Sequence, residues 1–144
     1  MDVLVVVDMQ KDFISGALGT KEAVAIVPRV AKKIAQAKKA GKTVVFTRDT
    51  HHENYLQTQE GKNLPVPHCI ENTPGWEIDP ALDTTGARIF DKPSFGSEEL
   101  VQYLKGLDNL TSAEFVGLCT DICVISNALL AKAYLPETPV YVDA

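Results

Sequence analysis

Cysteine is scarce in this chain, and long apolar runs are absent. The 144 residues include three cysteines and one tryptophan. The apolar start, "MDVLVVVDMQ", is too short to cross a bilayer and has no basic flank, so it does not resemble a signal peptide. An odd number of cysteines without a secretion signal predicts free thiols in a reducing, cytoplasmic compartment, with no membrane partner.

Positive charge is also scarce, and the formal net charge is -5. Because no basic stripe is present to neutralise phosphates, we expect no nucleic-acid partner. The densest basic cluster, Lys32, Lys33, Lys38 and Lys39, lies on an alanine-rich helical pattern and is typical of a solvated helix face. With 45% hydrophobic residues and no internal repeat, residues 1–144 are predicted to form a single domain with a buried core.

Five short runs rich in β-branched residues alternate with helical patterns. The runs are continuously apolar, which is typical of strands buried on both faces. They are "VLVVVD" (3–8), "KTVVFTRD" (42–49), "ARIFDK" (87–92), "AEFVGL" (113–118) and "PVYVDA" (139–144). Helical patterns cover residues 24–40, 97–106 and 121–135. The first ends at Gly41, and the second opens at Ser97. This alternation predicts a three-layer α/β fold with a mostly parallel sheet flanked by helices.

Reactive side chains follow the predicted strands. Asp8, Asp49 and Lys92 end the first three strands, and Cys123 lies just past the fourth. Because parallel strands deliver their carboxyl ends to one edge, these side chains are expected to converge there. Taken singly, an aspartate after a strand is commonly a helix cap and a lysine a surface residue. The conjunction favours a catalytic site.

The stretch "GLCTDICV" holds two of the cysteines, Cys119 and Cys123. A nucleophile, a zinc pair and small core residues are the alternatives; a disulfide is disfavoured in a reducing compartment. Thr120 as N-cap would place Cys123 at the third helical position, where the helix dipole, and a nearby lysine, would lower the thiol pKa. Asp8 could then take the thiol proton. Cys119, on the buried side of the strand end, is interpreted as core filler.

All three histidines lie in the long irregular stretch 50–80, and a loop of that length is usually functional. Asp49 and His51 follow a strand as D-x-H, and the loop can bring His68 back to them. One oxygen and two nitrogen ligands suit zinc, iron or manganese. The alternative is that these are solvent-exposed loop histidines.

Three ordered motifs, "VVVDMQKDF", "FDKPSFGS" and "GLCTDICV", resemble those of the isochorismatase-like cysteine hydrolases, and within them the nicotinamidases. The resemblance covers essentially the whole chain. It implies a catalytic triad of Asp8, Lys92 and Cys123. It also implies a cis peptide at Leu118–Cys119, which would direct the backbone N–H groups of Cys119 and Cys123 towards an oxyanion hole.

The resemblance also implies a catalytic metal, because nicotinamidases carry D-x-H followed by P-H-C. One divalent ion, with zinc first and iron or manganese as alternatives, would be held by Asp49, His51, His68 and a fourth ligand. Glu60 fits the glutamate version of that ligand, with Glu53 as its rival. His52 is expected outside the ligand set.

The resemblance implies hydrolysis of nicotinamide to nicotinic acid and ammonia through a thioester. Phe13 matches the family's pocket phenylalanine, and Pro65 stands where a tryptophan is often found. Phe95 and Trp76 are the other candidates for the pocket wall, although Trp76 could equally be a buried anchor. A hydrolase of another amide or carbamoyl compound, and a non-catalytic domain that binds a small ligand or a partner, are the alternatives.

Two further expectations follow from the same resemblance. The chain stops at Asp143-Ala144, where members of the family continue through another helix and strand, so a C-terminal segment is expected to be missing. The family often assembles through its helical faces, which predicts a homo-oligomer.

Overall fold

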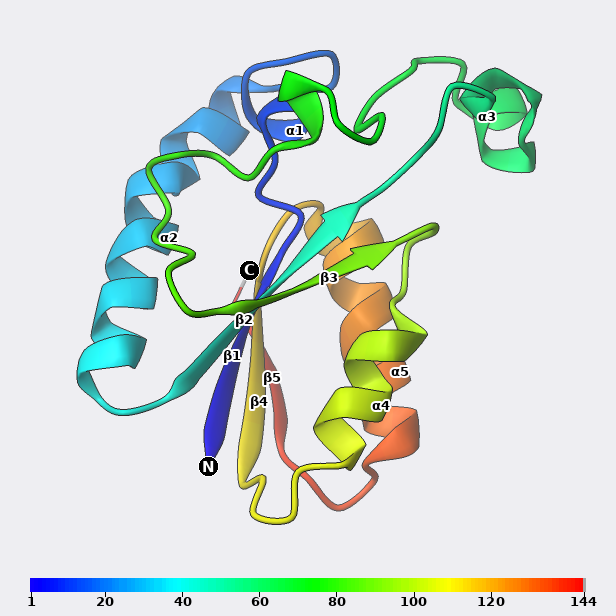
Figure 1. Ribbon diagram of the computed structural model, residues 1–144. Coiled ribbons are helices and arrows are strands. Elements are labelled where there is room, and N and C mark those ends of the chain that lie inside the picture. Colours follow the sequence, from blue (N-terminus) through cyan, green and yellow to red (C-terminus); the bar gives the residue numbers. More distant parts are fainter. Residues whose placement is uncertain (144) are drawn as a thin grey trace.

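The protein forms an open parallel sheet between two layers of helices (Figure 1). The computed structural model describes residues 1–143. The strands are β1 (Asp2–Val7), β2 (Thr43–Asp49), β3 (Arg88–Lys92), β4 (Ser112–Gly117) and β5 (Val140–Val142). Their order is β3-β2-β1-β4-β5, and every neighbouring pair is parallel. The predicted three-layer α/β fold is confirmed. The strand predicted to continue to 144 is shorter, and Ala144 lies outside the described residues.

β1 is the central strand because both of its faces are apolar. Val5 and Val7 pack into one core with Phe115 of β4, and Leu4 and Val6 pack into the other with Phe46 of β2. Successive side chains on a strand point to opposite faces, so an unbroken apolar run fills two cores at once.

α2 (Lys21–Lys39) covers one face of the sheet, and α4 (Glu98–Lys105) and α5 (Ile125–Tyr134) cover the other (Figure 1). The prediction began the first of these helices at residue 24, but it begins at Lys21 because the Thr20 hydroxyl accepts the Ala23 N–H. It ends, as predicted, before Gly41, whose φ is +76°. Ser97 caps α4 by accepting the Leu100 N–H, also as predicted.

The helix predicted over 121–135 is not one regular helix. It begins with a π-turn, η3 (Thr120–Val124), in which the Val124 N–H donates to the Cys119 carbonyl at 3.0 Å. The prediction of Thr120 as N-cap is wrong: Cys119 is the cap residue, and the wider turn brings Thr120 inside the helical segment. Cys123 is consequently the fourth residue of the turn and not the third.

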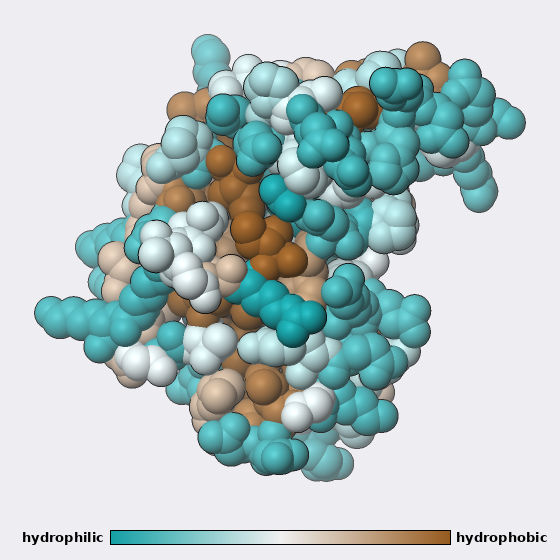
Figure 2. All heavy atoms as spheres, viewed as in Figure 1, coloured by the Kyte–Doolittle hydropathy of each residue, from teal (hydrophilic) through white to brown (hydrophobic). Residues whose placement is uncertain are grey.

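The stretch between β2 and β3 contains three short elements, η1 (Tyr55–Gln57), α3 (Gln59–Asn63) and η2 (Pro74–Trp76). A short helix, α1 (Lys11–Ile14), follows β1 at the same edge of the sheet. In Figure 2, hydrophobic residues gather between the two helical layers, and hydrophilic residues cover α3. Among residues 1–143, no helix combines the length and the apolar character that a membrane crossing requires.

Candidate active site

Two opposite charges are buried where β1 and β3 end. Asp8 and Lys92 are 0% and 1% exposed. Lys92 Nζ lies 2.7 Å from Asp8 Oδ2 and donates to the Ser94 carbonyl at 3.0 Å. Each charge compensates for the lost hydration of the other, and removal of one would leave a buried charge unpaired. The structure therefore brings these two predicted residues together at the carboxyl edge of the sheet.

Thr47 of β2 orients the Asp8 carboxylate. Its hydroxyl donates to Asp8 Oδ1 at 2.7 Å, and the Asp8 N–H donates to the Thr47 carbonyl at 3.1 Å. Oδ1 is thus occupied while Oδ2 faces Lys92. The sequence candidates did not include Thr47. The sheet register that pairs Val7 with Thr47 brings Thr47 next to Asp8, and the spacing of residues along the chain does not reveal that register.

Burial and charge shift the proton affinities of this pair. Burial raises the pKa of Asp8. The positive charge of Lys92 opposes this rise, and the negative charge of Asp49 adds to it. Burial alone would lower the pKa of Lys92, but the charges of Asp8, Cys123 and Asp49 hold it above its usual range. Lys92 therefore stays protonated, and Asp8 takes up a proton more readily than an exposed aspartate.

The Cys123 thiol lies beside this pair and is also buried. Burial raises its pKa, the charge of Asp8 raises it further, and Lys92 lowers it. The expectation that Lys92 and the helix N-terminus would lower this pKa below its usual value is therefore wrong. Loss of hydration outweighs both effects, so the resting sulfur keeps its proton.

The segment before the π-turn has the expected cis peptide, between Leu118 and Cys119. The Leu118 N–H donates to the Val7 carbonyl at 3.0 Å, which ties this segment to the strand that ends at Asp8. Gly117 has a φ of +123°, and a Cβ there would overlap the Val7 carbonyl, so only glycine fits. Within residues 1–143, the Cys119 N–H has no hydrogen-bond acceptor.

Four potential metal ligands converge next to the buried pair. One ligand atom from each of Asp49, His51, Glu60 and His68 lies within 4.8 Å of all the others. His51 Nε2 is 2.9 Å from Asp49 Oδ2 and 3.2 Å from Glu60 Oε2. The structure therefore places Glu60 in the candidate ligand cluster and leaves Glu53 exposed outside it.

The hydrogen bonds of His68 test whether this cluster fits a cation. His68 Nδ1 is 2.7 Å from the Val66 carbonyl, which can only accept, so Nδ1 carries the hydrogen. In the neutral ring, Nε2 then offers a lone pair, and it faces Asp49 Oδ2 at 3.4 Å. A cation satisfies both acceptors, either as a proton on Nε2 that Asp49 accepts or as a metal ion between the two atoms. Histidines that bind a metal commonly donate the hydrogen of their other ring nitrogen to a backbone carbonyl in this way.

Asp49 has an unused oxygen as well. Among the described residues, its buried Oδ1 has no hydrogen-bond partner, and Lys92 Nζ lies 3.7 Å away. Burial by itself would raise the pKa of Asp49, but hydrogen bonds with His51 and His68 and the charge of Lys92 hold it below its usual range. Asp49 is thus an ionised carboxylate with ligand capacity to spare, and it links the cluster to the buried pair.

Aromatic rings surround the two histidines. The Tyr55 ring centroid lies 4.7 Å from that of His51 and 5.1 Å from that of His68, and Phe13 lies 5.4 Å from His68. The Tyr55 hydroxyl donates to the Leu64 carbonyl. Burial, and then the charge of Glu60, raises the pKa of Tyr55 to about 12. Tyr55 was absent from the sequence candidates because nothing in its local pattern distinguishes it from a loop tyrosine.

The three predicted pocket residues occupy different environments. Phe13 is buried beside the ligand cluster. Trp76 is 7% exposed, its indole N–H donates to the Thr50 hydroxyl, and the Arg48 guanidinium covers its ring at 3.7 Å. This environment favours the buried-anchor alternative for Trp76. Phe95 is 46% exposed.

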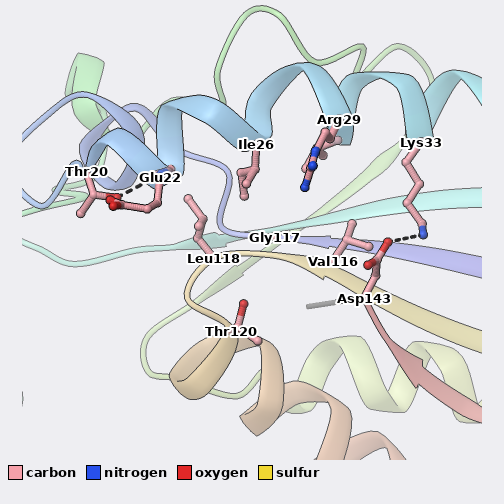
Figure 3. A pocket seen from close by; sticks show the side chains of 12 residues that line it. Thr20, Glu22, Ile26, Arg29, Lys33, Val116, Gly117, Leu118, Thr120 and Asp143 are labelled. Carbon is pink, nitrogen blue, oxygen red and sulfur yellow. Dashed lines mark hydrogen bonds and ion pairs between the residues drawn. The ribbon is translucent and has the colours of Figure 1, made fainter.

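A groove of about 310 Å³ opens between α2 and β4, away from these residues (Figure 3). None of the triad or ligand residues lines it. Leu118 lines it and also packs against the cluster of Phe13, Cys69 and Trp76. Leu118 therefore contacts both the groove and the cluster that contains Phe13.

The fold agrees with comparisons with known proteins. Residues 2–143 match the Isochorismatase domain, and the chain belongs to this family, in its nicotinamidase-like branch. It is 30% identical to the nicotinamidase/pyrazinamidase of Mycobacterium tuberculosis, over 99% of this chain and 85% of that protein. It is 28% identical to the nicotinamidase of Schizosaccharomyces pombe, over 90% of this chain and 76% of that protein.

A solved structure gives the same result. The pyrazinamidase of Pyrococcus horikoshii in complex with zinc is 34% identical and superposes with a TM-score of 0.83, over 98% of this chain and 82% of that one. Together these relatives identify the chain as a hydrolase of amide bonds.

Proposed function

We propose that the protein hydrolyses nicotinamide to nicotinate and ammonia, with Cys123 as nucleophile and one divalent metal ion beside it. The observation that carries this proposal is the buried Asp8–Lys92 pair in contact, through Asp49, with a four-ligand cluster. A structural ion pair needs no nucleophile and no cation site beside it, whereas metal-assisted amide hydrolysis by a thiol uses both.

The chemistry begins with the protonated thiol. Asp8 takes the thiol proton as the sulfur of Cys123 attacks the carboxamide carbon, and Lys92 stabilises the negative charge during this transfer. The carbonyl oxygen becomes an oxyanion, which the N–H groups of Cys119 and Cys123 stabilise. Asp8 then returns the proton to the nitrogen as the carbon–nitrogen bond breaks, and ammonia leaves.

The thioester that remains is hydrolysed by water. Asp8 accepts a proton from the water as its oxygen attacks the thioester carbon. The carbon–sulfur bond then breaks, Asp8 returns this proton to the sulfur of Cys123, and the nicotinic acid that leaves gives its remaining proton to solvent as nicotinate. The raised pKa of Asp8 suits a group that accepts and returns a proton in both half-reactions.

Asp49, His51, Glu60 and His68 would hold the metal ion, and the zinc-bound relative makes zinc the first choice, with iron or manganese as alternatives. When bound, the ion supplies a Lewis acid for the pyridine nitrogen of the substrate. Phe13 provides an apolar wall for the ring on the His68 side.

Ammonia release from a panel of amides tests the assignment. Nicotinamide should react faster than glutamine or asparagine, because a flat ring stacks on an aromatic wall while a flexible aliphatic amide loses rotamer entropy. Pretreatment with a chelator should remove the activity, and one equivalent of metal should restore it. Equal rates for aliphatic amides would contradict the substrate, and full activity without metal would contradict the metal assignment. Binding of nicotinamide without ammonia release would favour a non-catalytic domain.

A further inference from the structure

Gln10, in the turn between β1 and α1, makes three hydrogen bonds that the catalytic steps do not use. It is fully buried. Its Oε1 accepts the Asp49 N–H at 2.8 Å, and its Nε2 donates to the carbonyls of Asp49 and Trp76, each at 2.8 Å. One side chain therefore holds both the N–H and the carbonyl of Asp49. The donors and acceptors around the Gln10 side-chain amide fix its orientation.

Asp12, two residues further on, holds the other ligand loop. Its Oδ2 accepts the Cys69 N–H at 2.8 Å, and Cys69 directly follows His68. A Cβ on Gly75 would overlap the Asp12 carboxylate, so the glycine leaves the space that the carboxylate occupies. Backbone bonds hold the segment itself in place: the Lys11 N–H donates to the Glu77 carbonyl, and the Asp79 N–H donates to the Met9 carbonyl.

We propose that Gln10 and Asp12 are positioning residues for the metal centre. This inference rests on the proposed function. Asp49 and His68 come from segments that pair directly, since the His51 N–H donates to the Cys69 carbonyl, and their ligand atoms lie 3.4 Å apart. Gln10 fixes the backbone of the first and Asp12 the backbone beside the second, so one short segment after β1 is bonded to both and adds to this pairing in setting their spacing. Loss of an outer-shell partner typically weakens metal affinity by about 10- to 100-fold.

Four variants separate positioning from general stability. Gln10→Met keeps the length of the side chain and removes its three hydrogen bonds. Asp12→Leu removes the acceptor for the Cys69 N–H, whereas Asp12→Asn keeps an acceptor there and serves as the conservative rescue. Lys11→Ala, between the two positions, is the matched control, because only its backbone N–H is bonded to the loop.

Titration of the metal-free proteins with Co²⁺ gives the readout, since the visible absorption of the bound ion reports ligand geometry independently of turnover. Gln10→Met and Asp12→Leu should bind Co²⁺ about 10- to 100-fold more weakly, with an altered spectrum, while Asp12→Asn and Lys11→Ala should match the wild type. Wild-type affinity and spectrum in Gln10→Met and Asp12→Leu, even with a lowered melting temperature, would overturn the inference.

Two checks keep the experiment decisive. If Gln10→Met does not fold by circular dichroism, Gln10→Glu replaces it; this variant can still accept the Asp49 N–H but cannot donate to the two carbonyls, and the same loss of affinity is expected. Unchanged affinity in Gln10→Glu would overturn the inference. Failure of the wild type to bind Co²⁺ would overturn the proposed metal function, and the positioning role with it.

Discussion

At the scale of single residues, one lysine compensates for two carboxylates. Lys92 Nζ lies 2.7 Å from Asp8 Oδ2 and 3.7 Å from Asp49 Oδ1, in surroundings that exclude water. Removing the lysine leaves two buried negative charges facing each other, and breaking a buried pair typically costs about 3–5 kcal/mol.

Lys92→Met should therefore lower the free energy of unfolding by about 3–5 kcal/mol and abolish turnover. Urea unfolding and ammonia release measure the two effects. The double variant Asp8→Asn/Lys92→Met is the control, because it removes a charge of each sign. It should regain part of the stability and none of the activity. A single variant as stable as the wild type would show that the pair is solvated.

The two cysteines near the π-turn should differ sharply. Cys123→Ala should lose turnover while staying folded, because its sulfur is the proposed nucleophile. Cys119→Ala should keep most of the activity, because its proposed contribution is a backbone N–H that alanine retains, and its stability should fall by about 1 kcal/mol. Equal loss of turnover in both variants, measured as ammonia release, would indicate a shared metal or redox role instead.

Sequence reasoning located residues whose role follows from strand ends. Asp8, Asp49 and Lys92 could be placed at one edge because every parallel strand ends there. Gln10 and Thr47 could not, because each acts through a cross-strand hydrogen bond, and only the register of β1 against β2 brings them to Asp49 and Asp8. The rise in the pKa of Cys123 could not be predicted either. It comes from burial, and the position of a residue in a helix does not reveal how deeply it is buried.

At the scale of elements, the five-residue helix α3 delivers Glu60 to the cluster. The Thr58 hydroxyl accepts the Gly61 N–H at 3.0 Å and donates to the Tyr55 carbonyl at 2.6 Å. A Cβ on Gly61 would overlap the Tyr55 carbonyl, so α3 packs tightly against the turn before it. α3 was not predicted, since five residues are too few to show a helical period, whereas α2 and α4 were found from their longer patterns.

Glu60→Gln should weaken metal binding, because it replaces a carboxylate ligand with a neutral amide, while Glu53→Gln should have no effect. Elemental analysis after dialysis against limiting zinc, together with competition against a chelating dye, measures both. A loss of about tenfold or more is expected for Glu60→Gln. The reverse order of effects would reinstate Glu53 as the fourth ligand.

At the scale of the whole molecule, Lys33 joins the helix layer to the far half of the sheet. Its Nζ on α2 lies 2.8 Å from Glu114 of β4. It also lies 2.6 Å from Asp143, which follows β5 (Figure 3). Burial alone would lower the pKa of Lys33, but hydrogen bonds with Asp143 and Glu114 raise it above 10.5. The stabilisation is therefore fully present below pH 10.5 and is lost as the pH rises through the higher folded-state value.

Lys33→Met should accordingly be less stable than the wild type at pH 7, by up to about 1 kcal/mol because the pair is partly exposed. The difference should shrink as the pH rises above 10.5. Urea unfolding of both proteins across this range measures it. A difference that stays the same across this range would mean that the stabilisation does not come from the charge of the lysine.

The position of β1 at the centre of the sheet has a consequence for how the protein folds during synthesis. β1 precedes the other described strands along the chain and lies at the centre of the sheet, so its pairing with β4, as between Asp2 and Ser112, forms only after β4 has been synthesised. Parallel pairings between such distant residues form slowly, and an open edge exposes the chain to association in the meantime. Every proposed metal ligand is synthesised before β4, whereas Cys123 follows it. A partly folded chain that assembled the proposed ligands would still lack its nucleophile, so recovered turnover, and not bound metal, marks the completed molecule.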